Sequence, residues 1–376
     1  MLRIGFDAKR LVNNFTGFGN YGRTLIADLV AHYPEHEYLL FTPEITGTIE
    51  TKHLFESSSI KVVSPPRYRK LFWRSFGMKI DLNRHRINLF HGLAHEIPNA
   101  VTSLNIPKIV TICDVVYKHF PQSYPASTRI KKDQAISKAC TNADGIIAIS
   151  ASTKQDLINF FSIDPNRISV IHPSCDERFR KRYSSFSIDH VKKRYGLPDS
   201  YILYVGSVTE RKNILVACRA LRRIPEKDRS PLVVVGKQSG YSETVVNYIA
   251  KHHLDQWVTF AQVTSNDDLP LVYQGAELFI YPSLYEGFGI PVLEALCCGL
   301  PVITSNVSSL PEAAGTDSQL IDPSDPDAIA SAIARVLTDK ELSAKMITAG
   351  YAHSHRFNGN CIARELNDFY LQFCAT

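Results

Sequence analysis

The stretch that decides the fold runs Tyr285-Glu286-Gly287-Phe288-Gly289-Ile290-Pro291-Val292-Leu293-Glu294-Ala295. It follows an apolar run, residues 278–281, that predicts a buried strand. Gly287 and Gly289 allow the backbone to approach a ligand closely, and Pro291 suits the first turn of a helix. Free N–H groups and the positive end of the helix dipole make such a helix start an anion site. The stretch therefore predicts a phosphate-binding strand–loop–helix unit.

Two carboxylates flank this loop. Glu286 precedes the glycines, and Glu294 falls in the first turn of the predicted helix. Carboxylates accept hydrogen bonds, so both suit the hydroxyls of a sugar or a ribose. The alternative is that Glu294 only complements the helix dipole and that Glu286 is an ordinary loop residue.

Strand and helix patterns alternate on both sides of this unit. The expected strands are residues 3–6, 38–41, 60–63, 89–90, 108–112, 145–149, 201–205, 232–235, 258–260, 278–281 and 301–304. The expected helices are residues 21–32, 129–142, 151–160, 213–221, 243–252, 269–274, 291–298 and 327–337. Such alternation predicts βαβ units and parallel sheets, hence an α/β fold.

The alternation stops at an irregular, charged stretch, residues 172–183, and then restarts. We therefore expect two Rossmann-like domains. They are of similar size and join near residue 175. Open parallel sheets bind ligands beyond the carboxyl ends of their strands, so two such domains facing each other would place those ends around one cleft. Residues 360–373 carry apolar side chains at helical spacing, a stripe that must be buried.

Two further loops follow predicted strands. Gly206-Ser207-Val208-Thr209-Glu210-Arg211-Lys212-Asn213 places adjacent cations between a strand and a helix, where they could neutralise a departing diphosphate. A solvated basic turn before a helix is the alternative. Residues 17–22 match G-x-G-x-x-G, but a dinucleotide fingerprint starts directly after its strand, and here residues 9–16 intervene. We interpret them as a flexible glycine loop able to approach a phosphate, or as a plain turn.

Composition narrows the class of protein. The chain has 376 residues, 44% hydrophobic and 21% charged, with a formal net charge of +5. These values are typical of a globular protein of two to three domains and do not indicate nucleic acid as a partner. The apolar runs are too short to span a membrane, the N-terminus does not resemble a signal peptide, and the eight cysteines lack C-x-x-C spacing. We expect a cytoplasmic protein with reduced thiols.

One segment is strongly basic. Residues 67–86 contain seven Lys or Arg against Asp81 alone, with Leu71, Phe72, Trp73 and Phe76 among them. The pattern fits an interfacial helix on anionic lipid, and it fits a surface helix with an apolar core stripe and a solvated basic face. We favour the second interpretation.

Taken together, these loops resemble family 4 glycosyltransferases, retaining enzymes of the GT-B fold. The resemblance rests on an E-x7-E pair, Glu286 and Glu294, and on Arg211-Lys212-Asn213. Further matching stretches are Gly17-Phe18-Gly19, Phe90-His91-Gly92, Val110-Thr111-Ile112-Cys113-Asp114 and Ala148-Ile149-Ser150-Ala151-Ser152-Thr153. The set covers nearly the whole chain in the family's order.

The resemblance implies a nucleotide-sugar donor in the C-terminal domain and an acceptor bound mainly by the N-terminal domain. Glu294 would hold the ribose, and Arg211 and Lys212 would bind the diphosphate. Glu286 and the backbone of Phe288 and Gly289 would hold the donor sugar. The remaining donor-side positions are Gly17, Gly19, Gly206 and Ile290, and Asp114 lies on the acceptor side. The final helix would cross back to the N-terminal domain, so that domain would comprise residues 1–175 and 360–376, and the C-terminal domain residues 176–359.

Three positions depart from the family pattern. Cys113 stands where many members have histidine, which leaves open whether His91 or another group contacts the reacting centre; His91 is our candidate. Ser207 stands where many members have arginine, so Lys212 is a surer assignment than Arg211. The turn usually written N-G-V-D reads His172-Pro173-Ser174-Cys175-Asp176, which affects the hinge.

The implied reaction moves a hexose, with mannose slightly preferred, from a nucleoside-diphosphate sugar to a glycan or lipid-linked glycan hydroxyl with retention. It needs no metal and no cofactor. We expect front-face attack, with the leaving phosphate taking the acceptor's proton. A lipid-linked acceptor would bring residues 67–86 to the inner membrane face. Two rival functions are a dinucleotide-dependent oxidoreductase, which rests on residues 17–22, and a non-catalytic nucleotide-sugar-binding protein.

Overall fold

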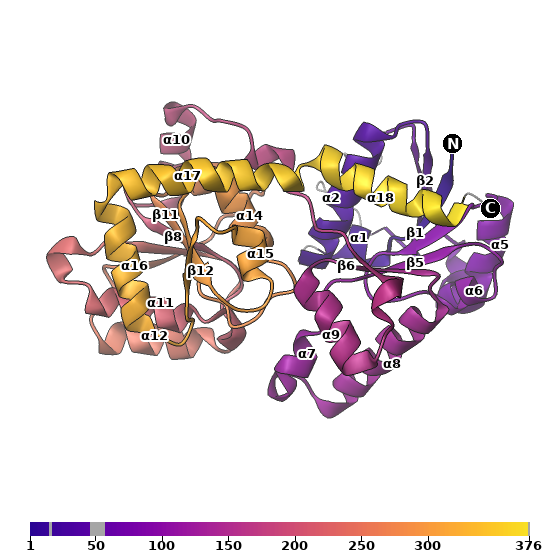
Figure 1. Ribbon diagram of the computed structural model, residues 1–376, viewed down its shortest axis with the longest axis horizontal. Helices are drawn as coiled ribbons and strands as arrows, with labels where there is room; N and C mark the ends of the chain where they lie inside the picture. The colour runs from indigo at the N-terminus through magenta and orange to yellow at the C-terminus, as the bar shows by residue number, and fades with distance from the viewer. Residues whose placement is uncertain (15–16, 46–56, 375–376) are drawn as a thin grey trace. The chain divides into compact units, whose positions relative to one another are not determined.

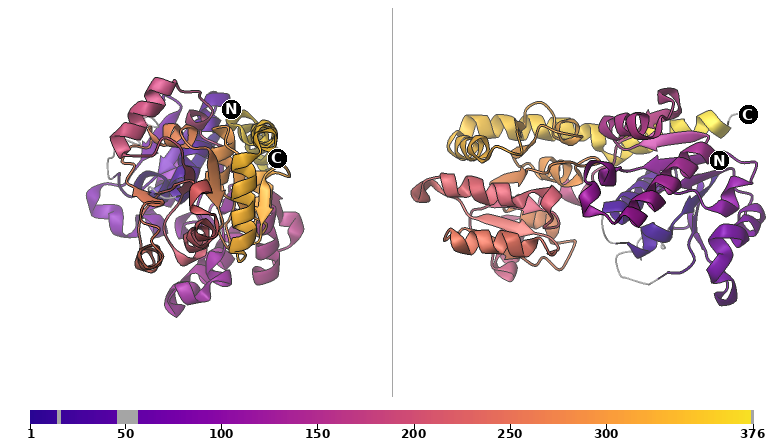
Figure 2. Two further views of the ribbon diagram at one scale, coloured as in Figure 1. Left: turned by 90° about the vertical axis from the view of Figure 1, so that its left-hand side faces the viewer. Right: turned by 90° about the horizontal axis from the view of Figure 1, so that it is seen from below.

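The computed structural model describes residues 1–14, 17–45 and 57–374. The chain falls into two compact units. Unit 1 comprises Met1–Ser174 and Phe357–Thr376, and unit 2 comprises Cys175–Arg356. Helices lie on both faces of the sheet in each unit (Figures 1 and 2). Each unit is therefore a three-layer α/β fold with its own core.

The sheet of unit 1 is parallel throughout, in the order β3-β2-β1-β4-β5-β6-β7. Its strands are β1 Arg3–Asp7, β2 Glu37–Phe41, β3 Ile60–Val63, β4 Leu89–Gly92, β5 Lys108–Ile112, β6 Gly145–Ala148 and β7 Ile168–Val170. Ile4 of β1 lies between Tyr38 of β2 and Leu89 of β4. The central strands are buried on both faces, which explains why they read as continuous apolar runs.

Helices of unit 1 surround this sheet. They are α1 Lys9–Asn13, α2 Gly17–His32, α4 Lys70–Phe72, α5 Met78–Arg84, α6 Asn99–Thr102, α7 Val116–His119, α8 Ala126–Asn142, α9 Ala151–Phe161 and α18 Gly359–Cys374. Helix α9 starts at a serine cap, because the Ser150 hydroxyl accepts a hydrogen bond from the Thr153 N–H at 3.0 Å.

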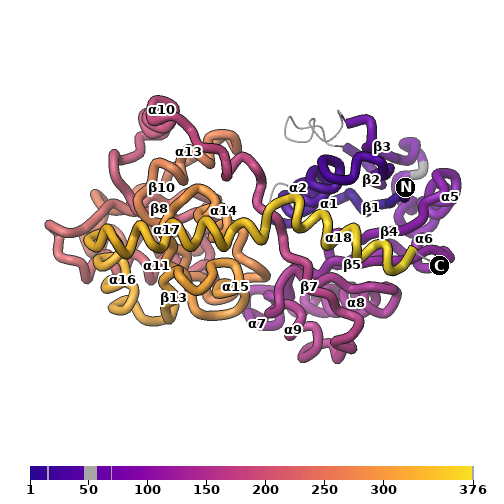
Figure 3. Tube along the Cα trace, turned by 45° about the horizontal axis from the view of Figure 1, so that its top comes forward, coloured from indigo at the N-terminus to yellow at the C-terminus, as the bar shows by residue number. Residues whose placement is uncertain are grey.

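The C-terminal helix α18 belongs to unit 1 and packs along α2 (Figure 3). Its buried face includes Ile362, Leu366 and Phe369, the apolar stripe seen in the sequence. Asn367 Oδ1 hydrogen-bonds His36 Nε2 at 3.0 Å within this interface. The expectation that the last helix returns to the N-terminal domain is confirmed.

Unit 2 has a second parallel sheet, in the order β10-β9-β8-β11-β12-β13. Its strands are β8 Ile202–Val205, β9 Leu232–Val235, β10 Val258–Ala261, β11 Leu278–Tyr281, β12 Val302–Ser305 and β13 Gln319–Ile321. Its helices are α10 Ser185–Tyr195, α11 Ile214–Arg223, α12 Ser242–Lys251, α13 Leu269–Gln274, α14 Ile290–Cys297, α15 Leu310–Ala314, α16 Pro326–Thr338 and α17 Lys340–Ser354. The α/β expectation of two Rossmann-like sheets is confirmed.

The basic segment differs from the favoured interpretation. It forms a 3₁₀ turn Arg67–Arg69, α4, a π-helical turn Trp73–Gly77 and α5. Trp73 is buried, but Leu71, Phe72 and Phe76 are exposed. The π turn accounts for this, because it places Trp73 and Met78, five residues apart, on the buried side. The expected apolar core stripe through Leu71, Phe72 and Phe76 is therefore wrong.

Candidate functional site

The sheet of unit 2 reverses its strand order between β8 and β11, which pair directly. Ligands of open parallel sheets bind beyond the carboxyl ends of the strands at such a point. The loop after β8 carries Arg211 and Lys212, and the loop after β11 carries Glu286. Topology alone thus brings together two sequence stretches that lie more than seventy residues apart.

The three side chains meet in one ionic cluster. Lys212 Nζ lies 2.6 Å from Glu286 Oε1, and Arg211 Nη1 lies 2.9 Å from the same oxygen. Ser283 Oγ also donates to Glu286 Oε1, at 2.6 Å. Burial alone would raise the pKa of Glu286, but the charges of Lys212 and Arg211 and these hydrogen bonds outweigh it and hold the pKa below its usual value. The cluster carries one carboxylate and two cations, so a net positive charge is buried here.

Tyr281 positions the side chain of Lys212. The Lys212 ammonium donates a hydrogen bond to the Tyr281 hydroxyl and lies 4.9 Å from the centre of the Tyr281 ring. Tyr281 is the last residue of β11 and stacks on Tyr204 of β8, with ring centres 5.8 Å apart. The sequence analysis did not single out Tyr281, although its place at the end of a strand, directly before the glycine loop, was a usable signal.

The glycine loop after β11 is held by the residues that precede α15. Ser309 Oγ donates to the Glu286 carbonyl at 2.9 Å and to the Phe288 carbonyl at 2.8 Å. Gly289 has φ 121°, which only glycine adopts readily, and it caps α14. Phe288, Gly289 and Ile290 therefore lie at the start of α14, where the sequence predicted them.

The Gly206 loop is also tightly packed. Gly206 N–H donates to the Val235 carbonyl at 2.8 Å. The loop continues into a 3₁₀ turn, Glu210–Lys212, and ends at Asn213 with φ 56°. Asn213 Nδ2 donates to the Pro282 carbonyl at 3.0 Å and to the Pro323 carbonyl at 2.7 Å. Asn213 stands at the N-cap position of α11 but makes no capping hydrogen bond through its side chain, which instead ties the Gly206 loop to the loops after β11 and β13.

Glu294 has a different partner. It lies half-buried in α14, and the Tyr273 hydroxyl of α13 donates to its Oε2 at 2.8 Å. Burial raises the pKa of Glu294 to about 8, the hydrogen bond from Tyr273 opposes this, and the charge of Asp176 adds to it. Glu294 is therefore a protonated carboxyl at neutral pH, a property that its position in the sequence did not reveal.

The glycines at residues 17–22 are helical. Helix α2 begins at Gly17, and a separate helix, α1, stands between it and β1. Gly17 is exposed, whereas Gly19 is buried against the carbonyl of Asn14, leaving no room for a Cβ. The expected flexible loop is therefore wrong for these residues. The oxidoreductase interpretation requires a strand that runs directly into the G-x-G-x-x-G turn, but here α1 separates β1 from the helical glycines.

His91 is buried in β4 with both ring nitrogens engaged. Nδ1 lies 2.7 Å from the Tyr370 hydroxyl of α18, and Nε2 lies 2.8 Å from Thr111 Oγ1. Burial lowers the pKa of His91 to about 3, so the ring is neutral. This enclosure makes His91 a positioning residue in the core of unit 1 rather than a group that touches a ligand.

The neighbourhood of Cys113 contains a second histidine. Cys113 is buried, and its N–H donates to His95 Nε2 at 3.0 Å. Asp114 follows, half-buried, and its Oδ1 accepts a hydrogen bond from the Val116 N–H at 3.1 Å. His95 lies beside the position where the family pattern has histidine, and the sequence analysis gave it no role.

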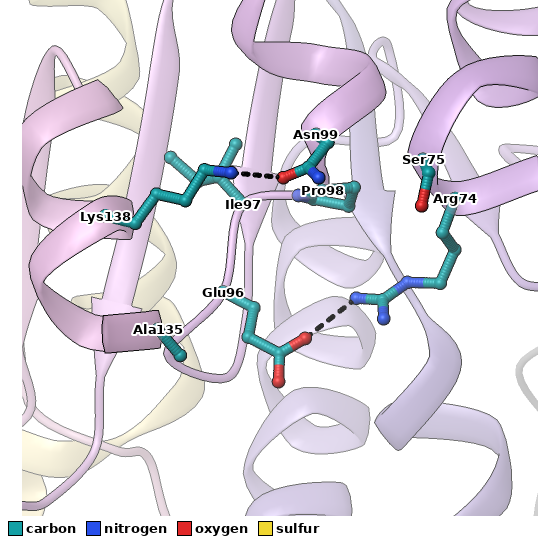
Figure 4. Close-up of a pocket in the computed structure, with 8 residues that line it drawn as sticks. All are labelled: Arg74, Ser75, Glu96, Ile97, Pro98, Asn99, Ala135 and Lys138. Atoms are coloured by element: carbon teal, nitrogen blue, oxygen red, sulfur yellow. Dashed lines mark hydrogen bonds and ion pairs between the residues drawn. The ribbon is translucent and has the colours of Figure 1, made fainter. Parts of the chain in front are cut away.

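Unit 1 has its own polar pocket where its strand order reverses, between β1 and β4. Arg74 contacts Asp7 at the end of β1. It also lies 3.1 Å from Glu96 in the loop after β4 (Figure 4). Lys138 of α8 donates to Asn99 Oδ1 at 2.6 Å on the other side. The cavity between Arg74, Glu96 and Lys138 measures about 240 Å³, and a second cavity of about 50 Å³, which Asp7 lines, shares Arg74 and Glu96 with it. Its polar lining suits hydroxyl groups.

Comparison with known proteins gives the family. The model of Glycosyltransferase Family 4 matches residues 16–179, and that of glycosyl transferases group 1 matches residues 187–353. The chain belongs to glycosyltransferase family 4. The matched spans hold the β8–β11 cluster, Glu294, His91 and Asp114.

This family 4 glycosyltransferase has curated relatives in Escherichia coli. It is 28% identical to O-antigen chain mannosyltransferase B over 98% of this chain and 100% of that protein. It is 30% identical to the serotype-specific mannosyltransferase WbdA over 72% of this chain and 34% of that longer protein. The crystal structure of HepE from Anabaena, in complex with UDP and glucose, superposes with a TM-score of 0.80 at 17% identity, covering 99% of this chain and 100% of that one. The GT-B fold is thereby confirmed.

The protein is thus a retaining hexosyltransferase that uses a nucleotide sugar. Such an enzyme must stabilise the negative charge that develops on the departing diphosphate. In unit 2, a buried cluster of net positive charge and a helix start lie together after the central strands, which suits that task.

Among the described residues, no helix is both long and apolar enough to cross a membrane.

Proposed function

We propose that the enzyme transfers mannose from a nucleoside-diphosphate mannose to a hydroxyl of a lipid-linked glycan at the cytoplasmic membrane face. The named mannosyltransferases among its relatives support the sugar and the glycan acceptor. The observation that carries the donor site is the Lys212–Glu286–Arg211 cluster at the point where the sheet of unit 2 reverses its order.

In the proposed donor complex, the diphosphate binds Arg211 and Lys212 and draws them away from Glu286. Glu286 then accepts hydrogen bonds from the donor sugar. The backbone at Phe288 and Gly289 lies beside it, because Ser309 holds both the Glu286 and the Phe288 carbonyls. Glu294 binds the ribose hydroxyls. The side chains of one cluster thus exchange an internal ion pair for contacts with the ligand.

The proposed chemical step keeps the configuration at the sugar carbon. The bond between that carbon and the phosphate oxygen breaks, and a bond to the acceptor oxygen forms on the same face. The acceptor's proton passes to the leaving phosphate oxygen. Arg211, Lys212 and the start of α14 stabilise the charge on the departing diphosphate; removing one such group typically costs about 10²–10³ in rate.

The polar pocket of unit 1 is the proposed acceptor site. Asp7, Glu96 and Asn99 offer oxygen acceptors there, and Arg74 and Lys138 offer donors. Asp114 follows the neighbouring strand β5 on the same edge of the sheet. A pocket with both donors and acceptors matches sugar hydroxyls, which need both.

The test is transfer to a synthetic lipid-linked mannoside from GDP-mannose, UDP-glucose or ADP-glucose, with the product's anomeric configuration read by NMR. We expect an α-mannoside from GDP-mannose only. Lys212→Met should abolish transfer, whereas Lys251→Met, at an exposed position in α12, should leave it unchanged. Another hexose in the product would overturn the mannose assignment, and binding without turnover would favour the non-catalytic alternative.

A further inference from the structure

Residues 67–84 expose a cluster of large apolar side chains on unit 1, here termed the aromatic face. It consists of Tyr68, Leu71, Phe72, Phe76 and Ile80, with exposed fractions of 81%, 86%, 65%, 73% and 58%. These are five of the thirteen exposed large hydrophobic residues found among the described residues. Scattered exposed apolar residues need no explanation, but a concentration of this kind marks an interaction surface.

Helix geometry places these side chains together. Tyr68, Phe72, Phe76 and Ile80 recur every four residues, whereas the buried Trp73, Met78 and Leu82 form the opposite side. The π-helical turn Trp73–Gly77 makes both patterns possible, because it inserts one residue between Trp73 and Met78. Packing of Trp73 and Met78 into the core therefore fixes the aromatic face outward.

The charges around the aromatic face are basic. Arg67, Arg84 and Arg86 are exposed at its ends, and Lys79 is half-buried beside Ile80. Asp81 accepts a hydrogen bond from Trp73 Nε1 at 2.7 Å, which holds it against the side chain of the buried tryptophan. Three carboxylates outside the segment pair with its cations: Glu44 lies 2.8 Å from Lys70, and Asp7 and Glu96 both contact Arg74. Exposed arginines thus border a surface of exposed rings.

We propose that the aromatic face docks on an anionic phospholipid surface. The rings and Leu71 enter the interfacial region, and the arginines contact lipid phosphates. Aromatic side chains bordered by cations match the layered chemistry of a bilayer surface. Positive charge at both ends of the face would oppose pairing with a second copy of itself.

The docking surface lies next to the polar pocket of unit 1. Arg74 and Ser75, in the same π-helical turn as Phe76, line that pocket. Docking would therefore place the pocket at the membrane surface, where a lipid-linked glycan is found. This last step rests on the proposed acceptor, whereas the docking itself does not.

The experiment is co-sedimentation of the full chain with vesicles of phosphatidylcholine containing about one third phosphatidylglycerol, compared with phosphatidylcholine alone. We expect binding to the anionic vesicles and a loss of about tenfold or more in partitioning for Phe72→Ser/Phe76→Ser, because two rings lose their burial. Phe186→Ser in unit 2, with an exposed fraction of 80%, is the matched control and should bind as wild type.

A second pair of substitutions removes basic side chains and tests the contribution of charge to vesicle binding. Each basic side chain near an anionic surface contributes about fivefold, so Arg67→Ala/Arg84→Ala should lower partitioning about 25-fold. Lys70 and Arg74 are unsuitable, because both are held in ion pairs. Equal binding of the double-serine variant and wild type would overturn the proposal. So would vesicle binding independent of phosphatidylglycerol, or self-association in solution that the serine variant abolishes. Donor hydrolysis without lipid reports separately on the proposed function.

Discussion

Replacing Glu294 by glutamine should stabilise the ligand-free protein, and more so as the pH rises. Burial raises the pKa of this carboxyl from 4.5 to about 8. Between these two pH values the folded chain keeps a proton that the unfolded chain has released. Stability therefore falls as the pH rises through this window. At about 1.4 kcal/mol per pH unit, the loss reaches at most about 5 kcal/mol by pH 8.

Glutamine removes this titration but keeps an oxygen that can accept the hydrogen bond from Tyr273. The free energy of unfolding, measured by urea denaturation at pH 5, 6.5 and 8, should show a gain for Glu294→Gln that grows with each step. Glu341→Gln, at an exposed position in α17, is the control and should show no trend with pH. A constant difference between Glu294→Gln and wild type from pH 5 to 8 would refute the reasoning, because it would mean that Glu294 is ionised throughout.

The same proton reports on the donor site. Ribose hydroxyls donate hydrogen bonds and so favour the ionised carboxylate. If Glu294 binds the ribose, nucleotide binding at pH 7 releases close to one proton. Titration calorimetry in buffers of different ionisation enthalpy should detect this release in wild type and not in Glu294→Gln.

Three further predictions follow from single contacts. Tyr370→Phe leaves the buried His91 Nδ1 without its 2.7 Å partner and should lower the free energy of unfolding by about 1–3 kcal/mol, measured by urea denaturation; a change under about 0.5 kcal/mol would contradict it. His91 itself should stay neutral in an NMR titration from pH 8 to pH 5, since burial lowers its pKa to about 3, and an inflection near pH 6.5 would disprove this. Gly145→Ala places a Cβ 2.7 Å from Phe373 and 2.8 Å from Phe369 of α18, so it should destabilise the protein by about 1–3 kcal/mol, measured as a lower Tm. An unchanged Tm would contradict the packing of α18 against Gly145.

The sequence predicted the sheets well because buried parallel strands are short, continuous apolar runs. Lys108–Ile112, Leu232–Val235 and Leu278–Tyr281 form strands with the expected bounds. Helix α17 carried a weaker signal. Its buried residues are Met346, Gly350 and Ser354, so the side that packs has the right spacing but little apolar character.

The site was predicted in its parts but not in its connections. Loops after strands identified Arg211 and Lys212 as functional candidates because cations bind phosphates, and Glu286 because a carboxylate accepts hydrogen bonds from sugar hydroxyls. Their ion pairs depend on the β8–β11 pairing, which is a property of the sheet order. The raised pKa of Glu294 could not be predicted from the sequence either, because it results from burial in the folded unit. The π-helical turn in residues 73–77 likewise depends on how Trp73 packs.

The most direct test of the donor site is titration calorimetry of wild type and Lys212→Met with GDP, UDP, ADP and NAD. The account predicts that one nucleoside diphosphate binds wild type, that NAD does not, and that Lys212→Met weakens the binding about tenfold or more, because a charge-assisted contact contributes about 1.5–3 kcal/mol. Equal affinity of the two proteins for every nucleotide would contradict the assignment of Lys212 and its cluster to the diphosphate.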